Sequence, residues 1–249
     1  MLLVERLTYF FAKHAIVTNE SYKEIAIKRG KKSPENVTIV RSGPDLSKLK
    51  VGAPKPEVKN GFNFLVGYIG VMGKQEGIDL LLQSIDYIVK EKKREDIRFC
   101  LMGGGPALEE LRELNQKLGL EKFVEFPGRV SNEYLADILN TADVCVNPDV
   151  PSEMNDKSTM NKIMEYMAFG KPIVQYTLKE GMFSAKQASL YAKNTDTIDF
   201  AEKILWLLEH PKEAQEMGVF GRNRVEKELC WEFEKPKLIS AYKKILNLD

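Results

Sequence analysis

Short apolar segments alternate with helical patterns along almost the whole chain, and this alternation constrains the fold more than any other feature. Seven runs rich in Val, Ile and Phe are typical of buried strands, at residues 14–18, 37–40, 62–69, 97–102, 123–126, 144–147 and 172–176. Helical patterns lie at residues 21–29, 77–92, 106–118, 132–140 and 159–169. Such alternation implies βαβ crossovers. We therefore expect an α/β fold with a doubly wound parallel sheet and helices on both faces.

Residues 45–60 interrupt this alternation. The stretch DLSKLKVGAPKPEVKN contains two prolines, one glycine and no periodicity, which is typical of a linker or an exposed connection. The C-terminal tail has a helical pattern that is broken near His210–Pro211 and again around Trp231. We expect a partial βαβ-like first domain, a linker, a larger domain and a final helix, at residues 1–46, 47–60, 61–230 and 231–249.

Composition and charge exclude several classes of protein. The chain is 43% hydrophobic and 29% charged, which is ordinary for a globular protein. Its 37 basic and 36 acidic residues leave a net charge of +1, so nucleic acid is not an expected partner. Cys100, Cys145 and Cys230 are too few for a disulfide framework, and we expect buried reduced thiols. Two histidines and no Cys/His cluster give no protein-built metal site.

The first residues form an amphipathic pattern rather than a membrane span. No apolar run approaches the roughly 20 residues that a span needs. The opening segment is interrupted by Glu5, Arg6 and Lys13, and its apolar side carries Leu2, Leu3, Leu7, Phe10 and Phe11. Such a face packs on a core or lies on a membrane surface. We expect a cytoplasmic protein with at most peripheral contact with the inner face of a membrane.

Two glycine-rich loops follow predicted strands. The first contains Gly70, Gly73 and Lys74, and the second is formed by Gly103–Gly105. Glycines at a strand-to-helix turn let the backbone approach a ligand, and the start of the helix favours an anion. The spacing G-x-x-G-x-x-G is not the dinucleotide-binding fingerprint. Both loops are candidates for ligand contact, and tight turns without a ligand are the alternative.

Residues 146–174 form the most informative motif. A strand ends at Pro148, a polar loop follows, and we expect a helix to begin near Ser158–Thr159, with Asp156 and Ser158 as candidate caps. Exposed amides at a helix start can hold phosphate oxygens. Glu165 lies about 10 Å further along the axis, where a carboxylate could bind sugar hydroxyls. A solvated glutamate on an amphipathic helix is the alternative.

Several segments share a family resemblance. They are STMNKIMEYMAFGKPIV, TLKEGMFSAKQASLYA, GVFGRNRVEKELCW, VTNESYKEIAIKRG and VRSGPDL. Together they resemble retaining nucleotide-sugar glycosyltransferases of family 4, group 1, which have the two-domain GT-B fold, and especially the O-antigen and capsule subgroup. The resemblance covers essentially the whole chain. It implies transfer of a sugar from a UDP- or GDP-sugar to a glycan or lipid-linked acceptor, without a metal or another cofactor.

The resemblance also implies roles for individual residues. Glu165 corresponds to the second glutamate of the family's acidic pair, which is expected on the ribose hydroxyls. Ser158, Thr159 and Met160 correspond to the phosphate-facing helix start. Arg129 lies in the segment that corresponds to the base-packing loop, where it could stack on the base or remain an ordinary surface arginine.

The sequence departs from the wider family at two places. The first glutamate of the pair is replaced by Lys157, so Asp156 or Asn155 becomes the candidate for contact with the sugar. The family's loop arginine and lysine fall at Val71 and Glu76. Three lysines are then candidates for neutralising the phosphates: Lys74, Lys157 and Lys162. No catalytic residue is assigned.

Most of the first GT-B domain has no counterpart in this chain. We therefore expect a fragment or one subunit of a split transferase, completed by a partner chain with the N-terminal domain or by homo-oligomerisation. The final helix is expected to cross back onto residues 1–46, and packing on the larger domain is the alternative. A sugar-nucleotide-binding module without turnover is the second functional hypothesis. A Rossmann-type oxidoreductase is the third, disfavoured because G-x-G-x-x-G is absent.

Overall fold

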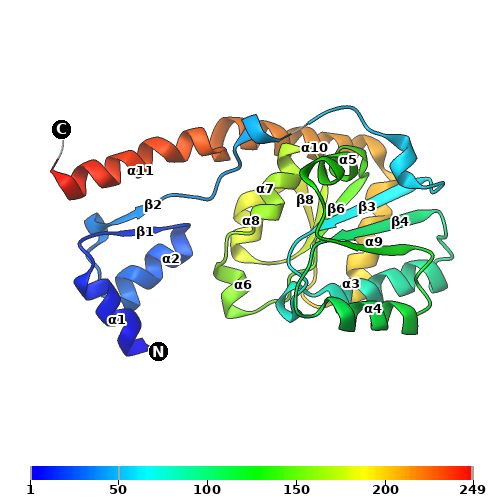
Figure 1. Ribbon diagram of the computed structural model, residues 1–249, viewed down its shortest axis with the longest axis horizontal. Helices are drawn as coiled ribbons and strands as arrows, with labels where there is room; N and C mark the ends of the chain where they lie inside the picture. Colours follow the sequence, from blue (N-terminus) through cyan, green and yellow to red (C-terminus); the bar gives the residue numbers. More distant parts are fainter. Residues whose placement is uncertain (1, 50, 248–249) are drawn as a thin grey trace.

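The computed structural model describes residues 2–49 and 51–247 and contains two units joined by a linker (Figure 1). Its strands are β1 (Ala15–Val17), β2 (Val37–Ile39), β3 (Phe64–Ile69), β4 (Ile97–Met102), β5 (Val124–Gly128), β6 (Val144–Asn147), β7 (Ile173–Tyr176) and β8 (Ser189–Ala192). Its α-helices are α1 (Leu2–Phe11), α2 (Glu20–Glu24), α3 (Ile78–Asp86), α4 (Leu108–Lys117), α5 (Asn132–Thr141), α6 (Glu153–Lys157), α7 (Asn161–Ala168), α8 (Lys179–Ala185), α9 (Thr197–Glu209), α10 (Pro211–Arg224) and α11 (Trp231–Leu246).

The larger domain, residues 61–230, is built on a six-stranded parallel sheet with the order β5-β4-β3-β6-β7-β8. Chain order therefore runs outward from β3 in one direction and then outward from β6 in the other. This is the doubly wound arrangement that the alternation predicts, and the strand order reverses between β3 and β6. Ligands in such sheets bind outside the carboxyl ends of the strands at that reversal.

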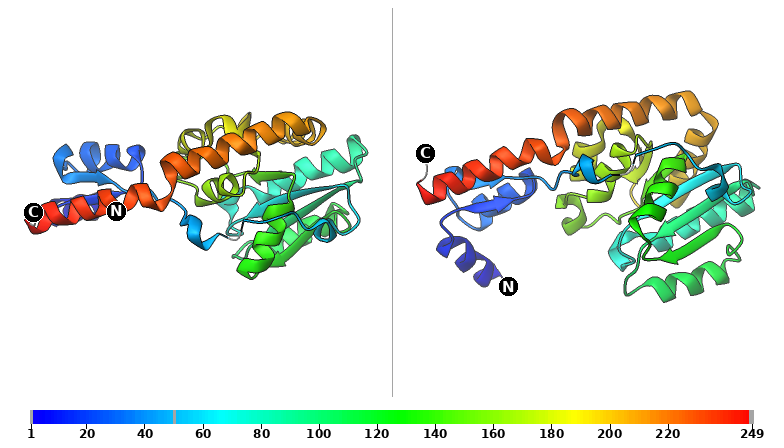
Figure 2. Two further views of the ribbon diagram at one scale, coloured as in Figure 1. Left: turned by 90° about the horizontal axis from the view of Figure 1, so that it is seen from above. Right: turned by 45° about the horizontal axis from the view of Figure 1, so that its top comes forward.

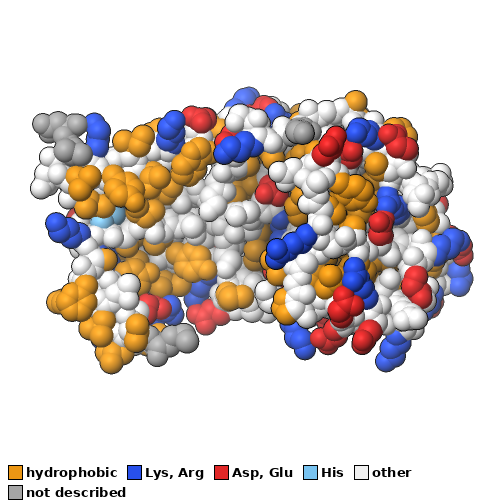
Figure 3. All heavy atoms as spheres, in the orientation of Figure 1, with side chains coloured by type: hydrophobic (Ala, Val, Ile, Leu, Met, Phe, Trp, Pro, Cys, Tyr) orange, Lys and Arg blue, Asp and Glu red, His pale blue; other side chains and the backbone are white. Residues whose placement is uncertain are grey.

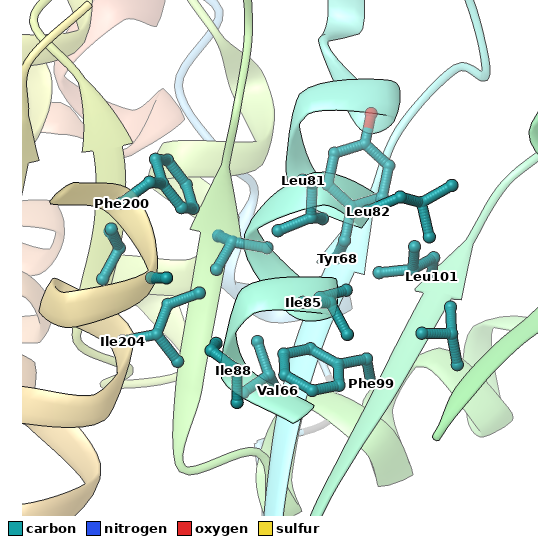
Figure 4. Close-up of a cluster of buried hydrophobic side chains, with 14 of the residues drawn as sticks. Val66, Tyr68, Leu81, Leu82, Ile85, Ile88, Phe99, Leu101, Phe200 and Ile204 are labelled. Atoms are coloured by element: carbon teal, nitrogen blue, oxygen red, sulfur yellow. The ribbon is translucent and has the colours of Figure 1, made fainter. Parts of the chain in front are cut away.

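Both faces of this sheet are covered by helices and buried apolar side chains. On one face, residues of α3, α4 and α9 pack on β3 and β4, and Figure 4 shows Leu81, Ile85 and Phe200 in this cluster. On the other face, residues of α5 and α7 pack against the same strands. Every residue of β4 is buried, including Arg98, and the other five are apolar, as is typical of a parallel strand covered on both faces. The predicted helices on both faces are thus confirmed.

The N-terminal unit, residues 2–46, is much smaller. Its two parallel strands, β1 and β2, share a buried core of only Val17, Ala26 and Val37. Helix α11 leaves the larger domain and runs alongside this unit, where Lys244 donates to the Glu35 carbonyl (Figures 1 and 2). The final helix, which was expected to cross back onto this unit, contacts β2.

Helix α1 is amphipathic, as expected, but none of its residues is buried. Its exposed apolar side chains are Leu2, Leu3, Val4, Leu7, Phe10 and Phe11. Apolar side chains gather at this end of the molecule, over α1 and the neighbouring part of α11 (Figure 3). Across the described residues, no helix is both long enough and apolar enough to cross a membrane.

The expected start of the helix in the most informative motif is wrong. Helix α7 begins at Asn161, its N-cap Met160 has no side-chain capping bond, and Ser158 instead ends the preceding helix α6. Asp156 does not cap α7 either, because its Oδ1 accepts the Lys179 amide at the start of α8, at 2.8 Å. Helices α6 and α8 and strand β8 were not expected. They are only four to seven residues long, too short to show a clear period.

The cysteines and the linker follow the expectations. All three thiols are free and buried, and burial raises the pKa of Cys100 to about 11 and that of Cys145 to about 12, so both stay protonated at neutral pH. Within its described residues, 47–49 and 51–60, the linker has no strand or α-helix, and it lies against α5. There the Gly52 amide donates to Asn140 Oδ1 at 2.9 Å.

Candidate functional site

The loops after β3, β4 and β5 meet at the carboxyl edge of the sheet. The Gly103 amide donates to the Gly128 carbonyl at 2.8 Å, and a Cβ on Gly103 would lie 1.8 Å from the Gly70 carbonyl oxygen. Gly103 also has φ of +145°, which residues with side chains rarely adopt. Only glycine therefore fits at this junction. The two glycine-rich loops singled out in the sequence form one continuous surface beside the strand reversal.

Helix α7 is fixed above this edge by a tyrosine. The Ile69 amide donates to the Tyr166 hydroxyl at 2.9 Å, and that hydroxyl donates to the Val146 carbonyl at 3.2 Å. Tyr166 thus connects α7 to the ends of β3 and β6, the two strands between which the order reverses. The start of α7 is thereby placed at the position where an open α/β sheet binds ligands.

A compact charge cluster lies directly below the start of α7. Lys162 Nζ is 2.5 Å from Glu76 Oε2 and 2.8 Å from Asp149 Oδ1, and all three side chains are largely buried. The Tyr68 hydroxyl donates to Glu76 Oε2 at 3.2 Å. Figure 4 shows this hydroxyl pointing away from the apolar cluster around Val66. One ammonium therefore faces two carboxylates in a poorly solvated place.

Burial controls the ionisation of this cluster. Desolvation raises the pKa of Asp149 to about 7, and the attraction of Lys162 offsets only part of this effect. Desolvation also opposes the ionisation of Glu76, but attraction and hydrogen bonding by Lys162 outweigh it and lower its pKa. Asp149 Oδ2 has no hydrogen-bond partner within the described part of the chain. Asp149 is therefore the group most easily protonated near neutral pH.

Glu165 faces a cavity of about 380 Å³ beside α7. Ser42, Gly43 and Pro44 of the N-terminal unit line this cavity together with Asn161, Glu165 and Trp231. Burial raises the pKa of Glu165, and no described residue forms a hydrogen bond or ion pair with its carboxylate. A desolvated carboxylate without a partner, lining a cavity, can accept hydrogen bonds from ligand hydroxyls.

The residues before α7 have mostly structural contacts. Asn155 is buried, and its Nδ2 donates to the carbonyls of Gln75 and Val150, both at 2.8 Å. This side chain ties the first glycine loop to the loop after β6. Asp156 is engaged at α8, while Ser158, Thr159 and Met160 form the half-buried connection between α6 and α7.

The remaining expected site residues lie around the rim. Lys74 is exposed beside Glu110 of α4 at 3.5 Å, and Lys157 pairs with Glu153 at 2.5 Å. Arg129 is exposed and lies over Gly104, with its Cγ 3.2 Å from the position of a Cβ there. Of the three lysines considered for the phosphates, the structure brings Lys162 against the glycine loop. Its Nζ lies 3.3 Å from a Cβ built on Gly70.

The set expected from the sequence lacks four residues of this region: Tyr68, Glu76, Asp149 and Asn19. Asp149 follows directly after a predicted strand, which is a local signal for a ligand-proximal position. Tyr68 lies inside a strand and Asn19 lies in the distant N-terminal unit, so no local pattern marks them. A larger cavity of about 540 Å³, lined by Trp206 among others, lies away from these loops between α9 and the segment before β4.

The geometry defines a class of protein, a doubly wound α/β domain with glycine-rich loops and the start of a helix at its strand reversal. The family described as "Glycosyl transferases group 1" matches residues 63–210, which is more than half of the chain. The chain therefore belongs to the group 1 glycosyl transferases. The matched region contains the whole cluster of Tyr68, Glu76, Asp149 and Lys162 as well as Glu165.

Similar proteins fit this assignment. The chain is 27% identical over 195 residues to the D-rhamnosyltransferase WbpZ of Pseudomonas aeruginosa, covering 74% of this chain and 47% of that protein. It is 25% identical over 151 residues to the putative colanic acid biosynthesis glycosyltransferase WcaL of Escherichia coli, covering 59% and 35%. The chain thus spans less than half the length of either relative.

Solved structures share the fold. Anabaena Alr3699/HepE, in complex with UDP and glucose, superposes with a TM-score of 0.80 at 16% identity, covering 97% of this chain and 66% of that one. Sucrose-phosphate synthase from Thermosynechococcus elongatus superposes with a TM-score of 0.77 at 22% identity, covering 99% and 61%. These neighbours are GT-B glycosyltransferases, so the expected fold class is confirmed.

Proposed function

We propose that the larger domain binds the nucleotide diphosphate of a UDP- or GDP-sugar, and that the complete protein transfers the sugar with retention to a glycan or lipid-linked acceptor. The observation that carries this proposal is Glu165, which faces a cavity without a partner while the start of α7 faces the strand reversal. The cavity is of a size that small-molecule sites have. In this arrangement Glu165 binds the ribose hydroxyls.

The phosphates lie between the glycine loops and α7. Unpaired amides at the start of a helix bind anions, and glycines permit close approach of the backbone. Lys162, which also pairs with Glu76 and Asp149, supplies the buried positive charge, whereas Lys74 is exposed and Lys157 pairs with Glu153. In this proposal the exposed Arg129 at the rim stacks on the base. Binding of UDP by a structural neighbour supports this class of ligand.

The experiment is calorimetric titration of the full chain with UDP and with GDP. We expect one of them to bind below the millimolar range. Glu165→Gln should weaken binding by about 1.5–3 kcal/mol, the range for hydrogen bonds to a charged group. Glu216→Gln, at an exposed site on α10, is the matched control and should leave binding unchanged. Absence of binding to both nucleotides would refute the proposal.

A binding module without turnover is the second candidate. The N-terminal unit has a sheet of two strands, and the apolar side chains of its helix α1 are exposed. Such a face could pack against further elements of an acceptor-side domain. We propose that this domain, on a partner chain or a second copy, covers that face. Nucleotide binding without sugar transfer to lipid-linked acceptors would favour the module, and transfer by the chain alone would exclude it.

A further inference from the structure

One buried side chain of the N-terminal unit reaches the segment between α6 and α7. Asn19 is completely buried, and its Nδ2 donates to the Lys157 carbonyl at 2.8 Å and to Thr159 Oγ1 at 2.9 Å. Its Oδ1 accepts the Tyr22 amide at 2.8 Å and so caps α2. Every polar atom of this amide is therefore used, and two of its bonds cross between the units.

A second residue of α2 reinforces this contact. The Tyr22 hydroxyl lies 3.1 Å from Ser158 Oγ, within hydrogen-bond distance. Lys157, Ser158 and Thr159, three consecutive residues, are thus each contacted by a polar group of the N-terminal unit. Within the larger domain, the Ser158 hydroxyl donates to the Met154 carbonyl at 2.7 Å, whereas the N-cap of α7, Met160, makes no side-chain capping bond.

The carbonyl of Lys157 explains why the contact matters. It lies at the C-terminal end of α6, where carbonyls have no partner within the helix. The amide of Asn19 satisfies this carbonyl and fixes its direction. The direction in turn sets where the following residues, up to the start of α7, present their amides.

We propose that Asn19, assisted by Tyr22, is a positioning residue that holds the segment 157–160 in the conformation that receives the donor diphosphate. This inference rests on the proposed function. The phosphate site is then assembled by both units rather than by the larger domain alone. Because coupling between two binding events is reciprocal, bound nucleotide also strengthens the docking of the N-terminal unit.

The rest of the interface between the units lies elsewhere. Ser21 donates to Glu180 Oε1 at 2.7 Å, and Arg41 Nη1 lies 3.5 Å from Glu180 Oε2. Ser21 and Arg41, the two partners of Glu180, are buried, but neither forms a hydrogen bond or ion pair with residues 157–160. Ser21 is therefore a matched control: it lies two residues from Asn19, is equally buried and also crosses the interface.

The test uses Asn19→Asp in the full chain. Aspartate keeps the oxygen that caps α2, but it cannot donate to the Lys157 carbonyl. We expect the Kd for UDP or GDP, whichever the wild type binds, to rise about tenfold, which corresponds to about 1.4 kcal/mol. Tyr22→Phe, which removes only one hydroxyl, should raise the Kd about threefold. Ser21→Ala should change it less than twofold when all variants are measured well below their melting temperatures.

Hydrogen exchange without nucleotide gives an independent readout. Asn19→Asp should accelerate exchange of the amides of residues 158–163, and Ser21→Ala should not. A Kd for Asn19→Asp within twofold of the wild type, or equal weakening by Ser21→Ala, would overturn the positioning role. If the wild type binds neither nucleotide, the proposed function fails. The exchange result then decides separately whether Asn19 holds this segment.

Discussion

The larger domain and the N-terminal unit contain the same kind of parallel strands but are stabilised in different ways. The larger domain buries apolar side chains on both faces of six strands. The N-terminal unit has two strands and a buried apolar cluster of three residues. A two-stranded sheet with so small a core is marginal in water. The small unit must therefore derive its stability from contacts outside itself.

Those contacts are mainly polar and buried. The Arg41 guanidinium lies 4.0 Å from the centre of the Phe183 ring in α8, and the Arg41 amide donates to Glu234 of α11 at 2.8 Å. Ser21 and Asn19 add the bonds to α8 and to the α6–α7 segment. The larger domain therefore folds around its own core, whereas the N-terminal unit is ordered by its contacts with α8, α11 and the α6–α7 segment.

Truncation of a buried side chain in each unit should give the largest change in the free energy of unfolding. Phe99 is fully buried in the larger domain, and Phe99→Ala should lower the free energy of unfolding by about 3–5 kcal/mol because it leaves a cavity. Val17→Ala in the N-terminal unit should cost about 1–2 kcal/mol and affect that unit only. Urea unfolding followed by circular dichroism measures the first effect, and hydrogen exchange of β1 and β2 measures the second. Equal shifts of the global midpoint would contradict the contrast.

Removal of the hydrogen bond between the Arg41 amide and Glu234 of α11 should have an intermediate effect on stability. Glu234 is 1% exposed, and Glu234→Ala leaves the Arg41 amide without its acceptor, at a cost of about 1–3 kcal/mol. We expect faster exchange in β1 and β2 and unchanged protection in β3 to β8. Lys237→Ala is the control, because it removes only the half-exposed ion-pair partner of the same carboxylate. If β3 to β8 lost protection as well, the two units would be a single cooperative core.

The sequence predicts the larger domain better than the small one for the same physical reason. Buried parallel strands such as β4 have mostly apolar sequences, so their positions can be recognised locally. The glycines at the strand ends and Glu165 are also local signals. In contrast, an apolar helix face such as that of α1 indicates that something covers it but does not show what.

The charge cluster could not be predicted because it depends on the strand order. Tyr68 and Lys162 are 94 residues apart, and Glu76 and Lys162 are 86 apart. Only the reversal between β3 and β6 brings them together. For this reason the sequence leaves three lysines as candidates for the phosphates. In the structure, Lys162 is the most buried of the three.

Protonation of Asp149 gives the smallest and most specific effect. With its pKa raised to about 7 by burial, Asp149 is mostly protonated at pH 6, where Lys162 and Glu76 balance each other. At pH 8 it is ionised, and the cluster carries one extra negative charge beside the proposed diphosphate. The repulsion between this charge and the diphosphate costs about 1–2 kcal/mol at an effective dielectric constant of 20.

The Kd for a nucleotide sugar, whose diphosphate does not titrate in this range, should therefore rise about threefold to tenfold from pH 6 to pH 8. Asp149→Asn should remove this rise and keep the affinity that the wild type has at pH 6. Glu165 is the other desolvated carboxylate of the proposed site, and burial raises its pKa. The titration is therefore repeated in the Glu165→Gln background, where the rise due to Asp149 should persist. If the Kd of Asp149→Asn still rose from pH 6 to pH 8, the titrating group would lie outside the cluster. Protonation of Asp149 would then not contribute to binding of the diphosphate.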